Sequence, residues 1–317
     1  MSTSPTLVFV PGAWHKPTCY DKIIHILQDQ HHLKCVAITL PSTTDNPNAT
    51  FKDDVDAARQ AIYTETSQGR DVVVLARSYG GMVGNSAVKG FTRPKSQSTT
   101  EPQSSSTGHV IGIVLIASGY TWTGVAFMDP FFGQPPPSWR VNKETGFAEL
   151  VLPPQKVFYH DLPAGEAEYW TSQLSSQSLK SLFEGGEHSY SGWLDVPSWY
   201  IGTIEDYGLP VVVQRMQVGM ARSMGAIVEH RELQTSHSPF LSKPEETVEI
   251  ITQAVAAFRG VEKTPSATPR PTASLIPQAR LSSPVTWVKY GLPYFFGRII
   301  GKCVLGFTWT RRLWRRT

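Results

Sequence analysis

The sequence lacks the features typical of secreted, disulfide-rich or metal-binding proteins. It contains only three cysteines, Cys19, Cys35 and Cys303, with no Cys-x-x-Cys or His-rich spacing. Neither a disulfide framework nor a metal site is therefore predicted, and no cofactor is expected. The apolar run Leu7–Val10 follows no charged segment and is too short for a secretory signal. We therefore expect a protein of the reducing cytoplasm.

An overall excess of charge is also absent, but the charges are unevenly distributed. The net charge is +3 over the whole chain. Residues 1–260 contain 19 Lys or Arg and 25 Asp or Glu, whereas residues 261–317 contain 10 and 1. A mildly acidic body is not expected to bind nucleic acid. The basic C-terminal segment needs an explanation of its own.

Between residues 7 and 260, apolar runs alternate with segments of helical periodicity. The runs typical of buried strands lie at 7–10, 35–40, 71–76, 110–117, 198–204 and 227–233. Strands that are apolar throughout are typical of a parallel sheet covered on both faces. Thr50 and Asp53 have the spacing of a capping pair, so a helix is predicted to begin at Phe51. The pattern predicts an α/β fold with a mainly parallel central sheet.

Three segments interrupt this alternation. Residues 93–108 are rich in Ser, Thr, Gln and Pro, which predicts a flexible insertion. Residues 120–196 contain several tryptophans and no clear strand, which predicts a helical lid between two late strands. Residues 261–283 are dense in Pro, Ser and Thr and predict a linker. The predicted organisation is a body of residues 1–260, this linker, and a basic aromatic extension of residues 284–317.

The extension, residues 284–317, is apolar and aromatic but interrupted by Lys289, Arg298 and Lys302. No window of 18 residues within 284–309 is free of charge, so a full membrane span is not expected. One interpretation is a disordered tail or a helix packed on the body. The other is contact with a membrane surface through the aromatic and cationic side chains. Both interpretations stay open from the sequence.

The segment 72–81, VVVLARSYGG, joins a β-type run to a turn of small residues at Ser78. A serine on a tight strand-to-helix turn stands exposed at the carboxyl end of a sheet, as in the G-x-S-x-G nucleophile elbow. Ala76 replaces the first glycine of that pattern, and a methyl group is compatible with the turn. We therefore predict Ser78 as a nucleophile.

An acid and a base follow in the chain order that accompanies a nucleophile elbow of this kind. Glu205 and Asp206 come directly after the strand predicted at 198–204. Asp206 lies deeper in the turn and is the favoured acid, with Glu205 as the alternative. His237 follows the last predicted strand, where a neutral imidazole can accept the Ser78 proton while the carboxylate fixes its tautomer.

Backbone N–H groups after the first strand and after the nucleophile are predicted to stabilise an oxyanion. By position they belong to Ala13 and Tyr79. Aromatic side chains beside this turn and in the lid are candidates to line an apolar pocket, with the alternative that they form core. The substrate-binding residues predicted on this basis are Trp14, His15, Phe131, Trp139 and Trp170.

Five segments taken together resemble the α/β-hydrolase superfamily. They are VPGAWHKPTCY (10–20), ARSYGGMVG (76–84), DLPAGEAEYW (161–170), YIGTIEDYGLP (200–210) and SHSPFLSKPEE (236–246). The resemblance extends from about Leu7 to Phe258. It is strongest to the small-esterase branch that includes plant methylesterases and hydroxynitrile lyases.

The resemblance implies the roles already assigned to Ser78, Asp206, His237, Ala13 and Tyr79. It departs from the family at Arg77, where His is frequent, and a cation there either points away from the pocket or perturbs the catalytic histidine.

The implied function is a serine hydrolase that cleaves a carboxylic ester or thioester of a small, apolar or aromatic molecule through an acyl-enzyme. The low-complexity insertion and linker are compatible with a tailoring enzyme of a small-molecule (secondary-metabolite) pathway. Two alternatives stay open. The same triad serves lyase or cyclase chemistry in relatives of this branch, and a hydrolase-like body can also bind a ligand without catalysis.

Overall fold

A computed structural model describes residues 4–93, 107–260 and 284–314, with side chains described as far as residue 307. The predicted linker 261–283 lies outside the described residues. Most of the predicted insertion 93–108 lies outside them as well.

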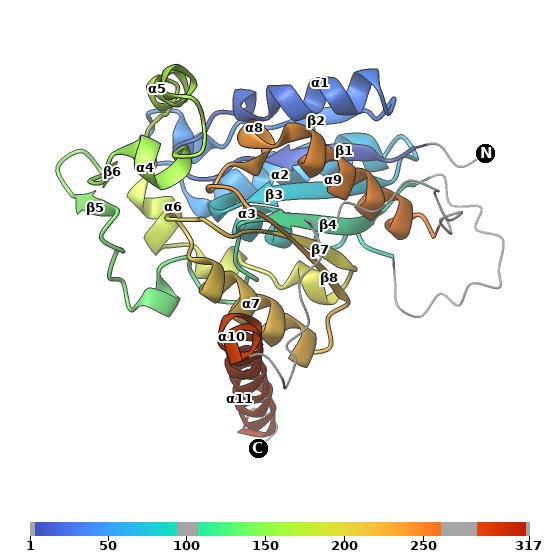
Figure 1. The fold of residues 1–317 in the computed structure, drawn as a ribbon. Helices are drawn as coiled ribbons and strands as arrows, with labels where there is room; N and C mark the ends of the chain where they lie inside the picture. Colours follow the sequence, from blue (N-terminus) through green and yellow to red (C-terminus); the bar gives the residue numbers. More distant parts are fainter. Residues whose placement is uncertain (1–3, 94–106, 261–283, 315–317) are drawn as a thin grey trace.

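A six-stranded parallel sheet forms the centre of the molecule (Figure 1). Its spatial order is β2-β1-β3-β4-β7-β8, and every pair of neighbours is parallel. The strands are β1 (Thr6–Val10), β2 (Cys35–Ala37), β3 (Val72–Arg77), β4 (Val110–Ile116), β7 (Ser198–Thr203) and β8 (Val228–Leu233). All six match apolar runs in the sequence, which confirms the predicted α/β fold with a mainly parallel sheet.

Helices cover both faces of the sheet, so each strand contributes to two cores (Figure 1). In β1, Leu7 and Phe9 pack in one core and Val8 and Val10 in the other. The first core includes α1 (Asp21–Asp29), α8 (Pro239–Ser242) and α9 (Pro244–Phe258), and the second α2 (Phe51–Thr66), α3 (Tyr79–Ala87) and α7 (Val211–Ser223). Helix α2 begins as predicted, with a capping box between Thr50 and Asp53.

The chain between β4 and β7 forms the lid predicted at residues 120–196. Its helices are α4 (Pro154–Phe158), α5 (Ala164–Ser172) and α6 (Leu179–Phe183), with short 3-10 turns η3 (Asp129–Phe131), η4 (Gly186–His188) and η5 (Gly192–Leu194). The prediction of a lid without strands is wrong. An antiparallel hairpin joins β5 (Trp139–Asn142) to β6 (Phe147–Leu150).

The hairpin's short strands have no apolar run to mark them. Cross-strand pairs stabilise the hairpin instead: Arg140 lies opposite Glu149 and forms an ion pair with it, with a nitrogen–oxygen distance of 2.9 Å.

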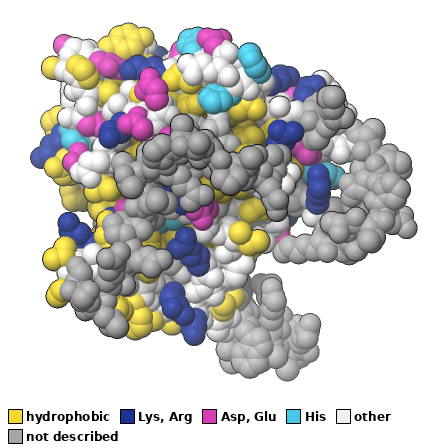
Figure 2. Space-filling model, turned by 45° about the vertical axis from the view of Figure 1, so that its right-hand side comes forward, with side chains coloured by type: hydrophobic (Ala, Val, Ile, Leu, Met, Phe, Trp, Pro, Cys, Tyr) yellow, Lys and Arg dark blue, Asp and Glu magenta, His cyan; other side chains and the backbone are white. Residues whose placement is uncertain are grey.

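The C-terminal extension consists of α10 (Pro284–Thr286), η7 (Trp287–Gly291) and the long helix α11 (Leu292–Trp314). Helix α11 packs on α7 and continues beyond the body (Figure 1). On the face drawn in Figure 2, hydrophobic side chains lie beside Lys and Arg side chains in the lower part of the molecule, at the height of α11 in Figure 1. In the described part of the chain, no helix combines the length and apolar character that crossing a membrane requires.

Candidate active site

Ser78 lies in a sharp turn between β3 and α3. Its backbone angles are φ 53° and ψ −128°, a conformation that costs a non-glycine residue on the order of 1–3 kcal/mol. Hydrogen bonds hold the turn: the N–H of Ser78 donates to the carbonyl of Ile116 (3.1 Å), and its carbonyl accepts from the N–H of Gly81 (2.9 Å) and from the hydroxyl of Ser118 (2.7 Å). The side chain is only half-buried, so the hydroxyl is accessible.

Small residues around the serine are required by close contacts. A Cβ at Gly80 would lie 2.1 Å from the carbonyl oxygen of Pro11, because the start of α3 presses on the turn after β1. The methyl group of Ala76, the departure from the glycine pattern, faces Gly84, where a Cβ would lie 3.0 Å from it. Gly84, which lies outside the motif, therefore leaves room for the methyl group at the first position of the motif.

Asp206 and His237 meet on the loops that follow β7 and β8. The Nδ1 atom of His237 lies 2.6 Å from Oδ2 of Asp206. The same oxygen accepts hydrogen bonds from the Thr203 hydroxyl (2.6 Å) and the Gln214 amide (3.1 Å). The carboxylate is thus fixed by groups of β7 and α7, and Nδ1 of the imidazole carries the shared proton. The Nε2 atom is then in the basic form that a general base requires.

The environment favours a charged Asp206 and a neutral His237. Burial alone would raise the pKa of Asp206, but His237 and the hydrogen bonds from Thr203 and Leu209 outweigh it and lower that pKa below its ordinary value. Burial lowers the pKa of His237, Asp206 opposes this, and the Arg77 guanidinium lowers it further. A neutral imidazole beside a carboxylate is the starting state for proton abstraction.

Glu205, the alternative acid, points to the surface. Its side chain is 45% exposed, accepts a hydrogen bond from Gln234 and lies 3.9 Å from His160. The structure therefore brings Asp206, and not Glu205, to His237.

Arg77 points under the histidine loop. It is 1% exposed, and its Nη2 and Nε atoms donate to the Ser238 hydroxyl (3.2 Å) and the His237 carbonyl (3.4 Å). The guanidinium also lies over the rings of Phe158 and Phe240, at 5.4 Å and 5.6 Å. In the described residues no carboxylate pairs with it. Arg77, the residue before Ser78, therefore supports the loop that carries His237.

Two backbone N–H groups beside Ser78 are available to a substrate. The predicted oxyanion donors, the N–H groups of Ala13 and Tyr79, donate to no other group in the described part of the chain. A Cβ at Gly12 would lie 3.1 Å from that of Ser78, so the oxyanion turn rests on the serine. Within the described residues, the Ser78 hydroxyl and His237 form no direct hydrogen bond, and such bonds often tighten only when substrate is present.

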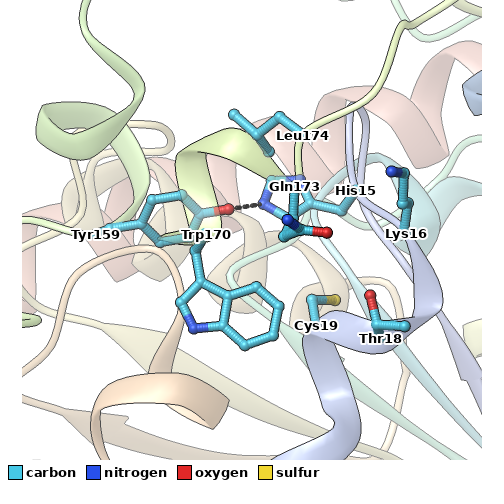
Figure 3. A pocket seen from close by; sticks show the side chains of 8 residues that line it. All are labelled: His15, Lys16, Thr18, Cys19, Tyr159, Trp170, Gln173 and Leu174. Atoms are coloured by element: carbon cyan, nitrogen blue, oxygen red, sulfur yellow. Dashed lines mark hydrogen bonds between the residues drawn. The ribbon is translucent and has the colours of Figure 1, made fainter. Parts of the chain in front are cut away.

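His15 holds the oxyanion turn and has no nitrogen left for substrate. Its Nδ1 donates to the carbonyl of Ala13 and its Nε2 accepts from the Tyr159 hydroxyl, both at 2.7 Å (Figure 3). Because a carbonyl only accepts, the proton lies on Nδ1. Burial, reinforced by Arg77, keeps its pKa well below the ordinary value. This histidine is a neutral clamp between the turn and the lid.

The other predicted pocket residues are divided among different surroundings. Trp170 shares with His15 a cavity of about 10 Å³, enough for about one water molecule, whose lining does not include Ser78 (Figure 3). Trp139 is buried and packs against Trp14 and Phe183. In the structure Trp170 and Trp139 both take part in packing.

Trp14 and Phe131 are both partly accessible to solvent. Trp14 lines an open hollow of about 370 Å³ together with the hairpin of the lid, and its indole N–H donates to the carbonyl of Ala148. Phe131 is 46% exposed and lies against Phe127, whose ring contacts Tyr79.

Phe158 is a site residue that the sequence did not single out. Its ring lies 5.7 Å from that of His237 and 6.3 Å from that of Trp14, and so it links the base to the oxyanion turn. No motif marks it, because it belongs to the lid and reaches the site only through the fold. Thr203 at the end of β7 and Gln214 on α7, which fix Asp206, were also missed, because no motif marks either residue.

Comparison with known proteins identifies the family. The profile of the Alpha/beta hydrolase family matches residues 7–250. Alpha/beta hydrolase nvfD of Aspergillus novofumigatus is 26% identical over 253 residues, which cover 79% of this chain and 96% of that protein.

Solved structures share the fold at lower sequence identity. A pyrethroid hydrolase from Sphingobium faniae JZ-2 superimposes with a TM-score of 0.59 at 19% identity, covering 80% of this chain and 98% of that one. Polyneuridine aldehyde esterase gives a TM-score of 0.58 at 20% identity, covering 80% and 99%. With the family profile extending over most of the body, the chain belongs to the alpha/beta hydrolase family.

Proposed function

We propose that this protein is a serine hydrolase that cleaves a carboxylic ester or thioester of a small molecule through an acyl-enzyme. The observation that carries the proposal is the strained turn at Ser78, which lies at the same sheet edge as the Asp206–His237 pair. A family of hydrolases with relatives named hydrolase and esterase supports the reaction class.

In the proposed reaction, His237 Nε2 takes the proton of the Ser78 hydroxyl as its oxygen attacks the carbonyl carbon of the substrate. The N–H groups of Ala13 and Tyr79 stabilise the oxyanion. His237 then gives the proton to the departing alcohol or thiol. A water molecule, deprotonated by the same histidine, releases the acid and restores the serine. Asp206 stays ionised throughout and holds the tautomer.

The surroundings of the site support an apolar or aromatic substrate. The ring of Phe158 lies beside His237, and the exposed Phe131 leads through Phe127 to Tyr79. Such walls favour apolar groups, while the few fixed polar groups orient the carbonyl. Relatives of the fold include one whose name states pyrethroid hydrolysis.

The proposal is tested with a panel of p-nitrophenyl esters and thioesters, measuring acid release by the wild type and by Ser78→Ala. We expect turnover in the wild type and a loss of at least ~10³-fold in the variant, because removing the serine of such a triad costs about as much as removing the whole triad. Ser67→Ala changes an exposed serine just after the end of α2 and is the matched control. A fluorophosphonate probe is expected to label the wild type and the control only.

Two outcomes would contradict the hydrolase. Labelling of Ser78 without turnover of any ester or thioester would favour lyase or cyclase chemistry on the same triad. Absence of labelling in folded protein would favour a binding protein without catalysis.

A further inference from the structure

Helix α11 has two apolar faces, of which the body covers one. The covered face packs on α7 through glycines: a Cβ at Gly297 would lie 2.1 Å from the Met216 carbonyl oxygen, and one at Gly301 would lie 1.8 Å from the Ser223 hydroxyl. Backbones approach this closely only where side chains are absent. The helix therefore has one fixed orientation on the body.

Hydrogen bonds fix the same face. The Tyr294 hydroxyl lies 2.7 Å from Nδ1 of the buried His230. The buried Arg215, which pairs with Glu232 through two hydrogen bonds (2.7 Å and 2.8 Å), also donates to the carbonyl of Lys289. The extension thus completes a buried polar cluster, and its rotation about its own axis is determined.

The opposite face is apolar and open. At 100° per residue, positions 295 and 299 lie about 160–200° around the helix from Gly297. This outer face carries large apolar side chains that are 42–55% exposed: Leu292, Phe295, Phe296 and Ile299. A helix that is apolar on both sides normally has partners on both sides.

The positive charge of the extension indicates which kind of partner would bind the outer face of α11. Residues 284–317 contain seven Lys or Arg and no Asp or Glu. Arg298 and Lys302 are exposed, lie one turn apart, and flank the outer face. Two copies of such a face would bring only like charges together, whereas anionic lipid headgroups would attract them.

We propose that the outer face of α11, formed by Leu292, Phe295, Phe296 and Ile299, lies on an anionic membrane surface. In this arrangement the four side chains enter the boundary between headgroups and acyl chains, and Arg298 and Lys302 extend to the headgroups beside them. The hydrolase body remains on the aqueous side, attached through α7.

The test uses the full chain and vesicles of phosphatidylcholine, with and without phosphatidylserine, in a sedimentation assay. We expect binding to the anionic vesicles that weakens on raising NaCl from 0.1 to 0.5 M. Phe295→Ser/Phe296→Ser/Ile299→Ser is expected to lower the partition coefficient at least tenfold. Arg298→Gln/Lys302→Gln is expected to lower it by on the order of tenfold, on anionic vesicles only.

The matched control, Tyr63→Ser/Ile227→Ser, removes apolar side chains that are 57% and 74% exposed elsewhere on the body, and it is expected to bind as the wild type does. All variants are checked for wild-type thermal unfolding and ester turnover, because none of these side chains lies in the site. Failure of the wild type to bind anionic vesicles would overturn the proposal. So would a lipid-free dimer that the triple variant abolishes while vesicle binding persists, since the face would then serve self-association.

Discussion

Arg77 places a positive charge within contact of the loop that carries His237, the proposed catalytic base. It donates to the His237 carbonyl and lowers the pKa of that histidine, and the same charge acts on His15. The cation is held by ring faces and neutral acceptors instead of a carboxylate. On the pKa of His237 it therefore acts in the direction opposite to the Asp206 carboxylate, which raises that pKa.

Removing this charge should shift the pH dependence of catalysis. In Arg77→Met, His237 loses a neighbour that disfavours its protonated form, so its pKa rises. The acidic limb of kcat/KM is expected to move to higher pH, measured on the best ester of the panel. Arg77→Lys keeps the charge and should leave the limb in place. If both variants lose kcat without a shift of the limb, Arg77 acts only by packing.

The two adjacent carboxylates offer a matched comparison. Asp206→Asn leaves the geometry in place but no longer fixes the basic tautomer of His237, so kcat is expected to fall by on the order of 10³–10⁴-fold. Glu205→Gln changes a side chain that is 45% exposed and turned to the surface, and it should change kcat less than about twofold. Steady-state kinetics of the two variants test this. A loss for Glu205→Gln as large as that for Asp206→Asn would contradict the assignment of Asp206 alone as the acid.

The residues that sequence could predict are those marked by position in the chain. Ser78, Asp206 and His237 each follow an apolar strand, and parallel strands bring their carboxyl ends to one edge. Phe158 and Gln214 lack such a marker because they reach the site through packing of the lid and of α7. Contacts between distant segments leave no local pattern to detect.

At the level of elements, the packing of β3 against α3 depends on a pair of small residues. A methyl group at position 76 and a hydrogen at position 84 fill the space between the strand and the helix. The hydrogen at position 84 therefore leaves room for alanine in place of the usual glycine of the elbow. The sequence displays both residues, but only the fold reveals that they face each other.

This exchange predicts a compensating pair. Gly84→Ala would bring two Cβ atoms within 3.0 Å and is expected to destabilise the protein by about 1–3 kcal/mol. Adding Ala76→Gly should recover part of that loss, giving a coupling free energy of about 0.5 kcal/mol or more in urea unfolding. Strictly additive effects would mean that the clash is absorbed elsewhere, for example by the Val74 side chain, which lies 3.1 Å from the same Cβ position.

For the whole molecule, the fold class follows from six apolar strands, whereas the course of the chain after the body does not. The position of α11 depends on glycine contacts with α7 and on the bond between Tyr294 and His230. Sequence composition left a disordered tail, a packed helix and a membrane-surface segment open. The fold adds that one face of the helix is used by the body and the other is free to bind.

The stability of the molecule should depend on pH through α2, which carries a buried carboxyl group. Asp54 accepts hydrogen bonds from the Tyr79 hydroxyl (2.7 Å) and the Ser42 N–H (2.9 Å). Burial nevertheless raises its pKa from 3.8 to about 6. Ionisation is then harder in the folded than in the unfolded state, so its contribution lowers the free energy of unfolding as pH rises from about 4 to 6 and stays lowered above that range.

The pH-dependent loss due to Asp54 amounts to about 3 kcal/mol at most, from 1.36 kcal/mol per pKa unit. Asp54→Asn cannot ionise, so the difference in urea-unfolding free energy between it and the wild type should change by up to this amount between pH 4 and pH 7.

Glu65, on the same helix, has a pKa that is lowered instead of raised. Despite its burial, Arg70, Lys34 and Thr6 lower its pKa to about 2, so its stabilisation is lost only as pH falls from about 4.5 towards 2. Glu65→Gln should therefore leave the slope between pH 5 and pH 7 unchanged, and a difference for Asp54→Asn that does not vary with pH would contradict the assignment.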